Sequence, residues 1–201
     1  GGRVYHAFER SFNLAECEDT GGTLHIGMDF NINPMSAVVC VQAGNELWAI
    51  DEISIPDANT DFMAQEIISR YNRRHIVVYP DPSGKARKTS AAVGQTDFSI
   101  LEGYGFDVVA SNKAPPIVDR INEVNAMLCN SEGERRFFVD PKCKNLIKSL
   151  EGLIYKDGTN VPDKASGLDH MADALGYLIH EMYPIDNNQA VGPIKIANYY
   201  G

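Results

Sequence analysis

Apolar and polar positions follow one pattern in the first part of the chain and another in the remainder. Near the start, three apolar runs are separated by turn residues, which predicts three strands in an antiparallel meander. These expected strands cover residues 23–30, 37–43 and 46–53. Further along, apolar positions at helical spacing alternate with short apolar runs, and this alternation predicts parallel strands joined by helices. The expected helices cover residues 60–71, 97–103, 117–129, 142–153 and 168–182, and the strands between them residues 75–79, 106–110 and 136–140.

Together these elements predict one α/β domain over residues 23–183. We expect a mixed sheet, made of the antiparallel three-strand meander plus parallel strands, flanked by helices. Residues 1–22 are polar and end in two glycines, which indicates a linker between domains or a loosely packed lead-in. Residues 184–201 are expected to form a polar tail. A chain of 201 residues is long enough to bury a core without disulfides or a structural metal.

Composition narrows the class of protein. With 44% hydrophobic and 22% charged residues, the sequence has the composition of a globular domain. No apolar run approaches the roughly 20 residues that span a bilayer, and the N-terminus lacks a signal-peptide pattern. We therefore expect no membrane contact and a cytoplasmic location. The cysteines are scattered without the paired spacing of a zinc site, which favours reduced thiols at Cys17, Cys40, Cys129 and Cys143.

The formal net charge of −9 weighs against a protein whose main task is to grip nucleic acid, because phosphate affinity comes from Lys and Arg. An enzyme that acts on nucleic acid stays possible. Carboxylates that hold metal ions raise the count of acids, while the bound cations restore positive charge locally. The position of the acids along the chain therefore matters more than their number.

Four acids stand in positions that call for a cation. Asp29 lies at the end of an apolar run, where a lone charge is costly to bury unless it is paired or binds a metal. Asp81 also follows an apolar strand and begins the sequence Asp-Pro-Ser-Gly. Asp169 and Asp173 are four positions apart on one face of the last helix, where like charges repel. Ligands with oxygen donors only suit Mg²⁺ or Mn²⁺ rather than zinc.

A cluster of these acids, from two strand ends and one helix, would hold one or two hard cations. With two ions, one activates a water and the other stabilises the leaving oxygen, so the expected reaction is hydrolysis of a phosphodiester. Lys85, Arg87 and Lys88 follow Asp81 in the chain and are candidates to contact a nucleic-acid backbone. Each acid alone also has an ordinary role at a turn or a helix start. The hypothesis therefore depends on all of them together.

Three segments carry a resemblance to a known family: residues 27–30 (Gly-Met-Asp-Phe), residues 79–84 (Tyr-Pro-Asp-Pro-Ser-Gly) and residues 169–177 (Asp-His-Met-Ala-Asp-Ala-Leu-Gly-Tyr). With the order of the elements, they resemble the ribonuclease H-like superfamily, and within it the nuclease domain of the large terminase subunit, the DNA-packaging protein of tailed bacteriophages. The resemblance covers about residues 20–183, with element boundaries good to a few residues.

This resemblance implies a metal-dependent endonuclease with two Mg²⁺ or Mn²⁺ ions that cuts concatemeric double-stranded viral DNA in the host cytoplasm. It further implies a packaging ATPase domain in the same parent chain, and the portal and the small terminase subunit as partners. No basic recognition helix is evident, so we expect weak sequence preference.

Carried over by motif, Asp29 and Asp81 match the first two metal-binding acids of the family. The family opens the last helix with two adjacent acids, whereas this chain has Asp169 and His170. The third ligand is thus open between Asp169 and Asp173, and Asp169 is favoured by its place at the helix start. His170 would serve as a ligand or a proton carrier.

Three other functions fit parts of the pattern. A Holliday-junction resolvase of the same superfamily has a similar order of acids but works as a dimer. One lobe of a sugar-kinase or actin-like ATPase also opens with a meander and an early Asp, but it needs glycine-rich phosphate loops that the turn at Gly44 and Asn45 does not make. A non-catalytic module, in which the acids hold a structural cation for partner binding, is the third.

Overall fold

A six-stranded mixed sheet forms the centre of the computed structural model, which describes residues 1–85 and 95–185. The strand order is β5-β4-β1-β2-β3-β6. Neighbouring strands are antiparallel in the β1–β2–β3 meander, whereas β4, β5 and β6 pair in parallel with their neighbours. The predicted fold class is therefore confirmed. The strands are β1 (Leu24–Asp29), β2 (Met35–Ala43), β3 (Glu46–Ile55), β4 (Ile76–Pro80), β5 (Asp107–Val108) and β6 (Phe137–Val139).

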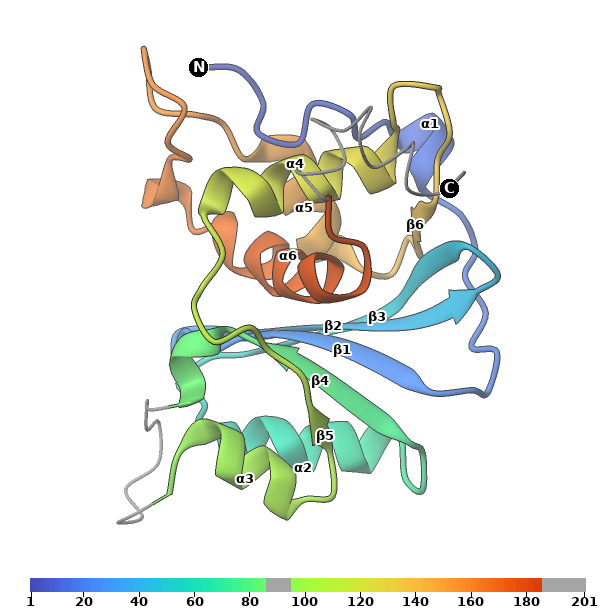
Figure 1. Cartoon of the computed structure of the whole chain (residues 1–201), viewed down its shortest axis with the longest axis vertical. Coiled ribbons are helices and arrows are strands. Elements are labelled where there is room, and N and C mark those ends of the chain that lie inside the picture. The colour runs from blue at the N-terminus through green and yellow to red at the C-terminus, as the bar shows by residue number, and fades with distance from the viewer. Residues whose placement is uncertain (86–94, 186–201) are drawn as a thin grey trace, which may run out of the picture.

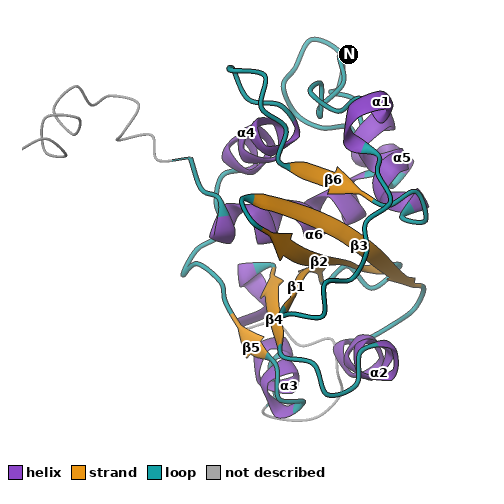
Figure 2. Cartoon of the chain, turned by 90° about the vertical axis from the view of Figure 1, so that its right-hand side faces the viewer, coloured by secondary structure: helices purple, strands orange, loops and turns teal. Residues whose placement is uncertain are grey.

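Helices cover both faces of this sheet (Figures 1 and 2). On one face lie α4 (Ile117–Leu128), α5 (Lys144–Gly152) and α6 (Asp169–Met182), and on the other α2 (Thr60–Arg70) and α3 (Asp97–Gly103). A four-residue helix, α1 (Arg10–Asn13), and two 3-10 turns, η1 (Pro82–Lys85) and η2 (Lys164–Ser166), complete the described elements. The expected helices all form, with ends shifted by at most two residues.

Strand β1 sends its side chains alternately to the two faces, as an extended backbone requires. Leu24, Ile26 and Met28 join the core beneath the sheet with residues such as Met63 of α2. Gly27, on the opposite face, lies under α6, where a Cβ atom would stand 2.0 Å from the carbonyl oxygen of Ala174. This close approach lets α6 lie directly over the end of β1.

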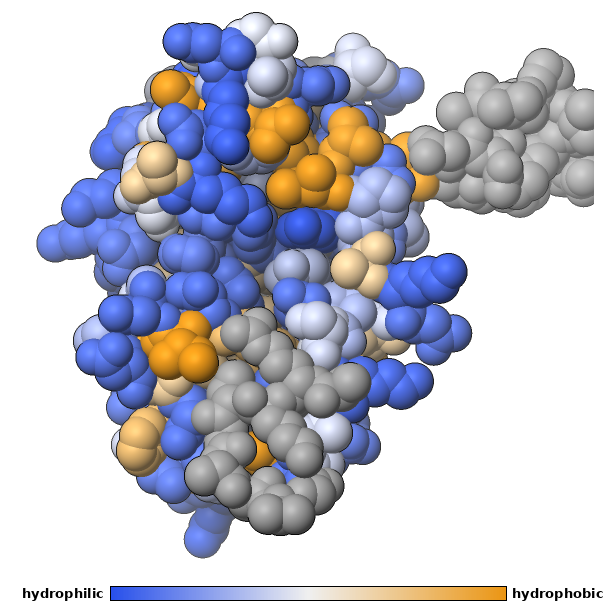
Figure 3. Space-filling model, turned by 90° about the vertical axis from the view of Figure 1, so that its left-hand side faces the viewer, coloured by the Kyte–Doolittle hydropathy of each residue, from blue (hydrophilic) through white to orange (hydrophobic). Residues whose placement is uncertain are grey.

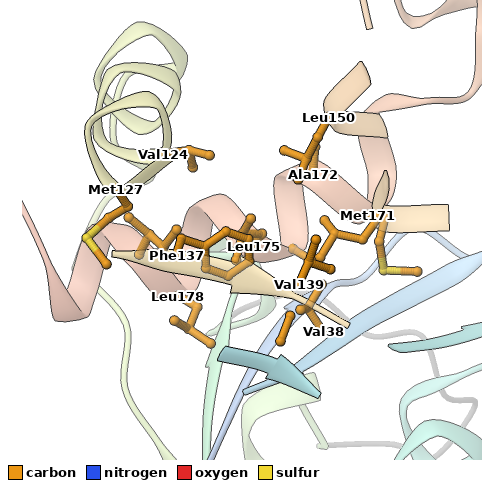
Figure 4. Packing of buried hydrophobic residues seen from close by; sticks show 14 of the residues in the cluster. Val38, Val124, Met127, Phe137, Val139, Leu150, Met171, Ala172, Leu175 and Leu178 are labelled. Carbon is orange, nitrogen blue, oxygen red and sulfur yellow. The ribbon is translucent and has the colours of Figure 1, made fainter. Parts of the chain in front are cut away.

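The larger core lies between the sheet and the layer of α4, α5 and α6. Figure 4 shows Leu175 and Leu178 of α6 packed among side chains from the sheet and from α4. Val38, Val124, Phe137 and Leu175 are essentially inaccessible to solvent. Burial at this level fixes the position of α6, which makes it a rigid support for the side chains at its N-terminal end.

The N-terminal segment packs against the domain. Val4, Tyr5 and Phe8 are at most 2% exposed, and the Val4 amide donates to the carbonyl of Leu153 at 2.9 Å. The expectation of a loose lead-in is therefore wrong, because these apolar residues, although spread among polar ones, join the larger core next to α4 and the end of α5. A role for residues 1–22 as a connection between domains stays a prediction.

Two further expectations concern the ends and the cysteines. Of the expected tail, residues 186–201 lie outside the described residues, as do residues 86–94 after η1. All four cysteines are free, as the sequence predicted. Among the described helices, none has both the length and the apolar character needed to cross a bilayer.

Candidate active site

A cleft of about 160 Å³ lies where β1 ends, η1 begins and α6 starts. On this side of the molecule the surface between the two helix layers is mainly hydrophilic, with apolar patches above and below it (Figure 3). The four acids that the sequence singled out, and His170, all line this one cleft. The complete lining is Asp29, Asn31, Asp81, Lys164, Asp169, His170, Asp173 and Tyr177.

The parallel pairing of β1 with β4 brings the first two acids together. Residues Gly27 and Met28 pair with Tyr79 and Pro80, so Asp29 and Asp81 both leave the sheet at the same edge. The Asp81 amide continues the ladder by donating to the carbonyl of Met28 at 3.1 Å. Carboxyl ends of parallel strands are the usual place for a site in such sheets.

The loop after Asp81 is held by local contacts. The Ser83 amide donates to Asp81 Oδ1 at 2.9 Å, which closes the turn that Pro80 and Pro82 begin. Gly84 lies against the ring of Phe30, where a Cβ atom would come within 2.1 Å of a ring carbon. The Asp-Pro-Ser-Gly sequence therefore sets the orientation of the Asp81 carboxylate and packs the loop against the residue that follows Asp29.

Helix α6 supplies the other two acids from successive turns. Asp169 stands in its first turn, where the helix dipole favours a negative charge. Asp169 is 4% exposed and Asp173 8% exposed, so both carboxylates are almost out of water. Oδ1 of Asp169 is buried and makes no hydrogen bond with any described residue. An oxygen of this kind is costly to bury without a partner, and it marks a place for a cation.

His170 lies between two of the acids. Its Nδ1 is 3.3 Å from Asp29 Oδ2, and its Nε2 is 3.8 Å from Asp169 Oδ1. The hydrogen bond to Asp29 raises the pKa of His170 above its ordinary value, with burial acting in the opposite direction. The histidine therefore has the position and the charge to neutralise Asp29 when no metal is bound.

Lys164 and Arg120 form ion pairs with the two acids of α6. Lys164 Nζ lies 3.8 Å from Asp169 Oδ2, and Arg120 Nη1 donates to Asp173 Oδ1 at 3.3 Å. Burial raises the pKa of Asp173 to about 6, and the neighbouring Arg120 acts to lower it. The ionised form of Asp173 is thus costly in the folded protein despite its ion pair.

The donor set fits a hard divalent ion, although the side chains are not arranged around one. Within residues 1–85 and 95–185, no three His, Cys, Asp or Glu side chains form a group that could enclose a metal in the present arrangement. The reason lies in the pairs described above, since Asp29, Asp169 and Asp173 each face a cationic side chain instead. With carboxylate oxygens only and one of them unpartnered, the residues suit Mg²⁺ or Mn²⁺ once these side chains reorient.

The sequence predicted the acids of the cleft and His170, but not the other residues that line the cleft or contact these acids. Asn31 was detectable, since it follows Asp29 in the turn that closes the strand. Lys164 and Tyr177 line the cleft, and Arg120 lies behind it, but no spacing in the sequence relates them to the acids. Of the three basic residues expected to contact nucleic acid, Lys85 is exposed at the end of η1, while Arg87 and Lys88 lie outside the described residues.

Comparisons with known proteins give one family model and several solved structures that are similar to this chain. The family model of the terminase RNase H-like domain matches residues 26–182. The fold is similar to the large terminase of a thermophilic bacteriophage, with a TM-score of 0.71, 15% identity, and coverage of 90% of this chain and 44% of that one. This chain therefore spans less than half of that relative. A search of curated proteins gave no match.

Two separate nuclease domains are also similar in fold. The P22 large terminase nuclease domain has a TM-score of 0.66 and 16% identity, with coverage of 93% of this chain and 96% of the other. The large terminase nuclease domain of bacteriophage SPP1, solved with bound Mn, has a TM-score of 0.56 and 18% identity, covering 81% of this chain and 88% of the other. At such identities the likeness concerns the fold.

Proposed function

Because the chain belongs to the family of terminase RNase H-like domains, we propose that it is a metal-dependent endonuclease that cuts concatemeric double-stranded viral DNA during genome packaging. One observation carries this proposal: Asp29, Asp81, Asp169 and Asp173, from three separate segments, line a single cleft, and a buried oxygen of Asp169 accepts no hydrogen bond from any described residue. A structural role in turns or helix caps gives no reason for four acids to meet.

In this proposal Asp29, Asp81 and Asp169 hold two Mg²⁺ or Mn²⁺ ions. When bound, such ions activate the attacking water and stabilise the oxygen that leaves the phosphorus. Asp169 is assigned as the third ligand because its Oδ1 accepts no hydrogen bond from the described residues, whereas Oδ1 of Asp173 is already engaged by Arg120. The SPP1 nuclease domain with bound Mn supports the choice of metal.

The remaining side chains of the cleft would act on protons and on the substrate. His170 is hydrogen-bonded to Asp29, and its side chain is 23% exposed. It can therefore release the Asp29 carboxylate to a metal and carry a proton at Nδ1. Lys164 lines the cleft with its side chain 60% exposed, and Lys85 is exposed at the end of η1. We assign contacts with phosphates of the DNA backbone to these two lysines, together with Arg87 and Lys88. Contacts to the backbone alone give weak sequence preference.

The parent protein is proposed to be longer than this chain. The large terminase of the thermophilic bacteriophage is more than twice as long, since this domain covers 44% of it. We assign a packaging ATPase domain to the same parent chain, with residues 1–22 as the connection, and the portal and the small terminase subunit as partners in the host cytoplasm.

Nicking of a supercoiled plasmid tests the proposal. We expect relaxation of the plasmid with Mg²⁺ or Mn²⁺ and none with EDTA. Asp81→Asn should reduce the rate at least about 100-fold, because a direct metal ligand is lost. Asp107→Asn is the matched control, since Asp107 is exposed and pairs with His75 away from the cleft, and it should cut at the wild-type rate. Absence of metal-dependent cleavage by the wild-type chain at all protein concentrations would refute the nuclease function.

A further inference from the structure

Arg120 is a buried cation that belongs to none of the sequence motifs described above. It lies in the first half of α4, and its side chain is only 10% exposed. An arginine is rarely buried to this extent unless its charge is matched, because removing the guanidinium from water is costly. Its single ion pair among the described residues is the one with Asp173, and its Nε makes no hydrogen bond with them.

Several contacts of Arg120 reach the face of α6 that forms the cleft. Its guanidinium lies 4.5 Å from the centroid of the Tyr177 ring, and Tyr177 itself lines the cleft. Between Asp173 and Tyr177 the side chain passes over Gly176, where a Cβ atom would already lie 3.5–3.8 Å from Arg120 atoms. One planar group thus contacts two successive turns of α6, through a hydrogen bond to an acid and stacking on an aromatic ring.

Arg120 differs from the other two cations of the site in its freedom to move. The side chains of His170 and Lys164 are 23% and 60% exposed, so both can turn toward solvent when a metal ion enters. Arg120 is enclosed between α4 and α6 and has no comparable path. Its pair with Asp173 would therefore persist when a metal binds, whereas the other two pairs would be exchanged for the metal.

We propose that Arg120 is a positioning residue, which holds Asp173 by one oxygen and Tyr177 by its ring so that the second oxygen of Asp173 faces the metal cluster. This inference deepens the proposed function and depends on a metal binding in the cleft. In other proteins, mutation of a residue that hydrogen-bonds to a metal ligand and orients it lowers metal affinity about 10- to 100-fold. The simpler alternative is an ion pair that only stabilises the contact between α4 and α6.

Calorimetric titration with Mn²⁺ in the absence of DNA distinguishes these roles. Arg120→Met should weaken Mn²⁺ binding about 10-fold or more, and Arg120→Lys, which keeps the charge and loses the planar contacts, should recover part of that loss. Arg74→Met is the matched control. Arg74 forms a comparable ion pair with Asp19 far from the cleft, with a side chain 20% exposed, and its loss should leave Mn²⁺ affinity within about twofold while still lowering the unfolding midpoint in EDTA.

A double mutant shows whether Arg120 acts through Asp173. In an Asp173→Asn background, Arg120→Met should change Mn²⁺ affinity by less than about twofold, because the carboxylate that it orients is gone. The same loss in both backgrounds, or wild-type affinity in Arg120→Met, would overturn the proposal. If Arg120→Met does not fold, Arg120→Lys decides, since it should bind Mn²⁺ several-fold more weakly and wild-type affinity would refute the role. A wild-type chain that binds Mn²⁺ without cutting DNA refutes the nuclease function alone.

Discussion

Gly27 and Ala174 are in direct backbone contact: a Cβ atom on Gly27 would stand 2.0 Å from the Ala174 carbonyl oxygen. Since Asp29 lies two residues beyond Gly27 and Asp173 directly precedes Ala174, this one contact sets how far apart two acids of the cleft lie. Any side chain at position 27 must push α6 away from β1, and the acids of the two elements move apart with it.

Gly27→Ala should therefore impair both folding and metal binding. We expect a loss of at least about 2–3 kcal/mol in the free energy of unfolding, because the added methyl meets backbone atoms that cannot yield. Urea unfolding measures the loss, and Mn²⁺ titration should show weaker binding. Gly103→Ala, at the end of α3 with open space around it, is the control and should be neutral or slightly stabilising. Wild-type stability in Gly27→Ala would show that α6 can shift freely.

The stability of Asp173→Asn relative to the wild type should increase as the pH rises in the metal-free protein. Burial raises the pKa of Asp173 from its ordinary value of 3.8 to about 6 in the fold. The ionised form is thus disfavoured by folding, and the wild-type chain loses stability as the pH rises from about 4 through 6. The neutral amide avoids this cost, although it leaves the buried Arg120 without its counter-charge at every pH. Between about pH 4 and pH 8 the difference in free energy of unfolding should therefore shift by on the order of 1–3 kcal/mol in favour of Asp173→Asn.

Chemical unfolding of both chains in EDTA at acidic, intermediate and alkaline pH, about 4, 6 and 8, measures this difference. The change of the difference with pH is the informative quantity, since titrating groups away from Asp173 contribute equally to the two chains. A stability difference that stays constant across the pH range, or that shifts toward the wild type as the pH rises, would contradict the cost assigned to the buried carboxylate.

Asp169→Asn and Asp173→Asn should differ in their effect on metal binding. Asp169 has a buried oxygen that accepts no hydrogen bond from the described residues, whereas Asp173 is held by Arg120, so Asp169 is the direct ligand in our assignment. We expect Asp169→Asn to weaken Mn²⁺ binding at least about 100-fold and Asp173→Asn about 10-fold. Calorimetry on the two variants at one pH decides the order. A larger loss in Asp173→Asn would reverse the assignment.

Lys164→Gln should tighten Mn²⁺ binding and weaken DNA binding. Its ammonium group stands 3.8 Å from Asp169 Oδ2 and competes with a metal ion for that carboxylate. Removing it should raise Mn²⁺ affinity several-fold and lower the slope of log affinity for DNA against log salt by about 1, as for the loss of one phosphate contact. Lys148→Gln on α5 offers a matched removal of a lysine outside the cleft lining. Weaker Mn²⁺ binding in Lys164→Gln would contradict the competition.

The fold and the acids were predictable because their signals are local. Apolar runs that end in Asp29 and Asp81 mark strand ends, and the turn at Gly44 marks the meander. The spacing of Asp169 and Asp173 places both on one helix face. These features depend on residues close together in the chain, where hydrophobic period and turn chemistry are informative.

What the sequence could not provide depends on contacts between distant segments. The buried position of Arg120 follows from the packing of α4 on α6, which no period in α4 reveals. The packing of Val4, Tyr5 and Phe8 next to α4 and the end of α5 is likewise a tertiary effect that overrides the polar character of residues 1–22. Which oxygen of Asp169 is left without a donor also follows from three-dimensional packing alone.

Asp29 and His170 touch although 141 positions separate them in the chain. The first strand of the sheet thus meets the start of the last described helix, and the cleft closes only when α6 has docked. A ribosome-bound chain that has not yet released residues 169–182 carries the two strand acids without their counterparts. Under the proposed function, an incomplete copy of the domain would therefore lack part of the metal site, and cleavage of DNA would require that α6 has been synthesised and has docked.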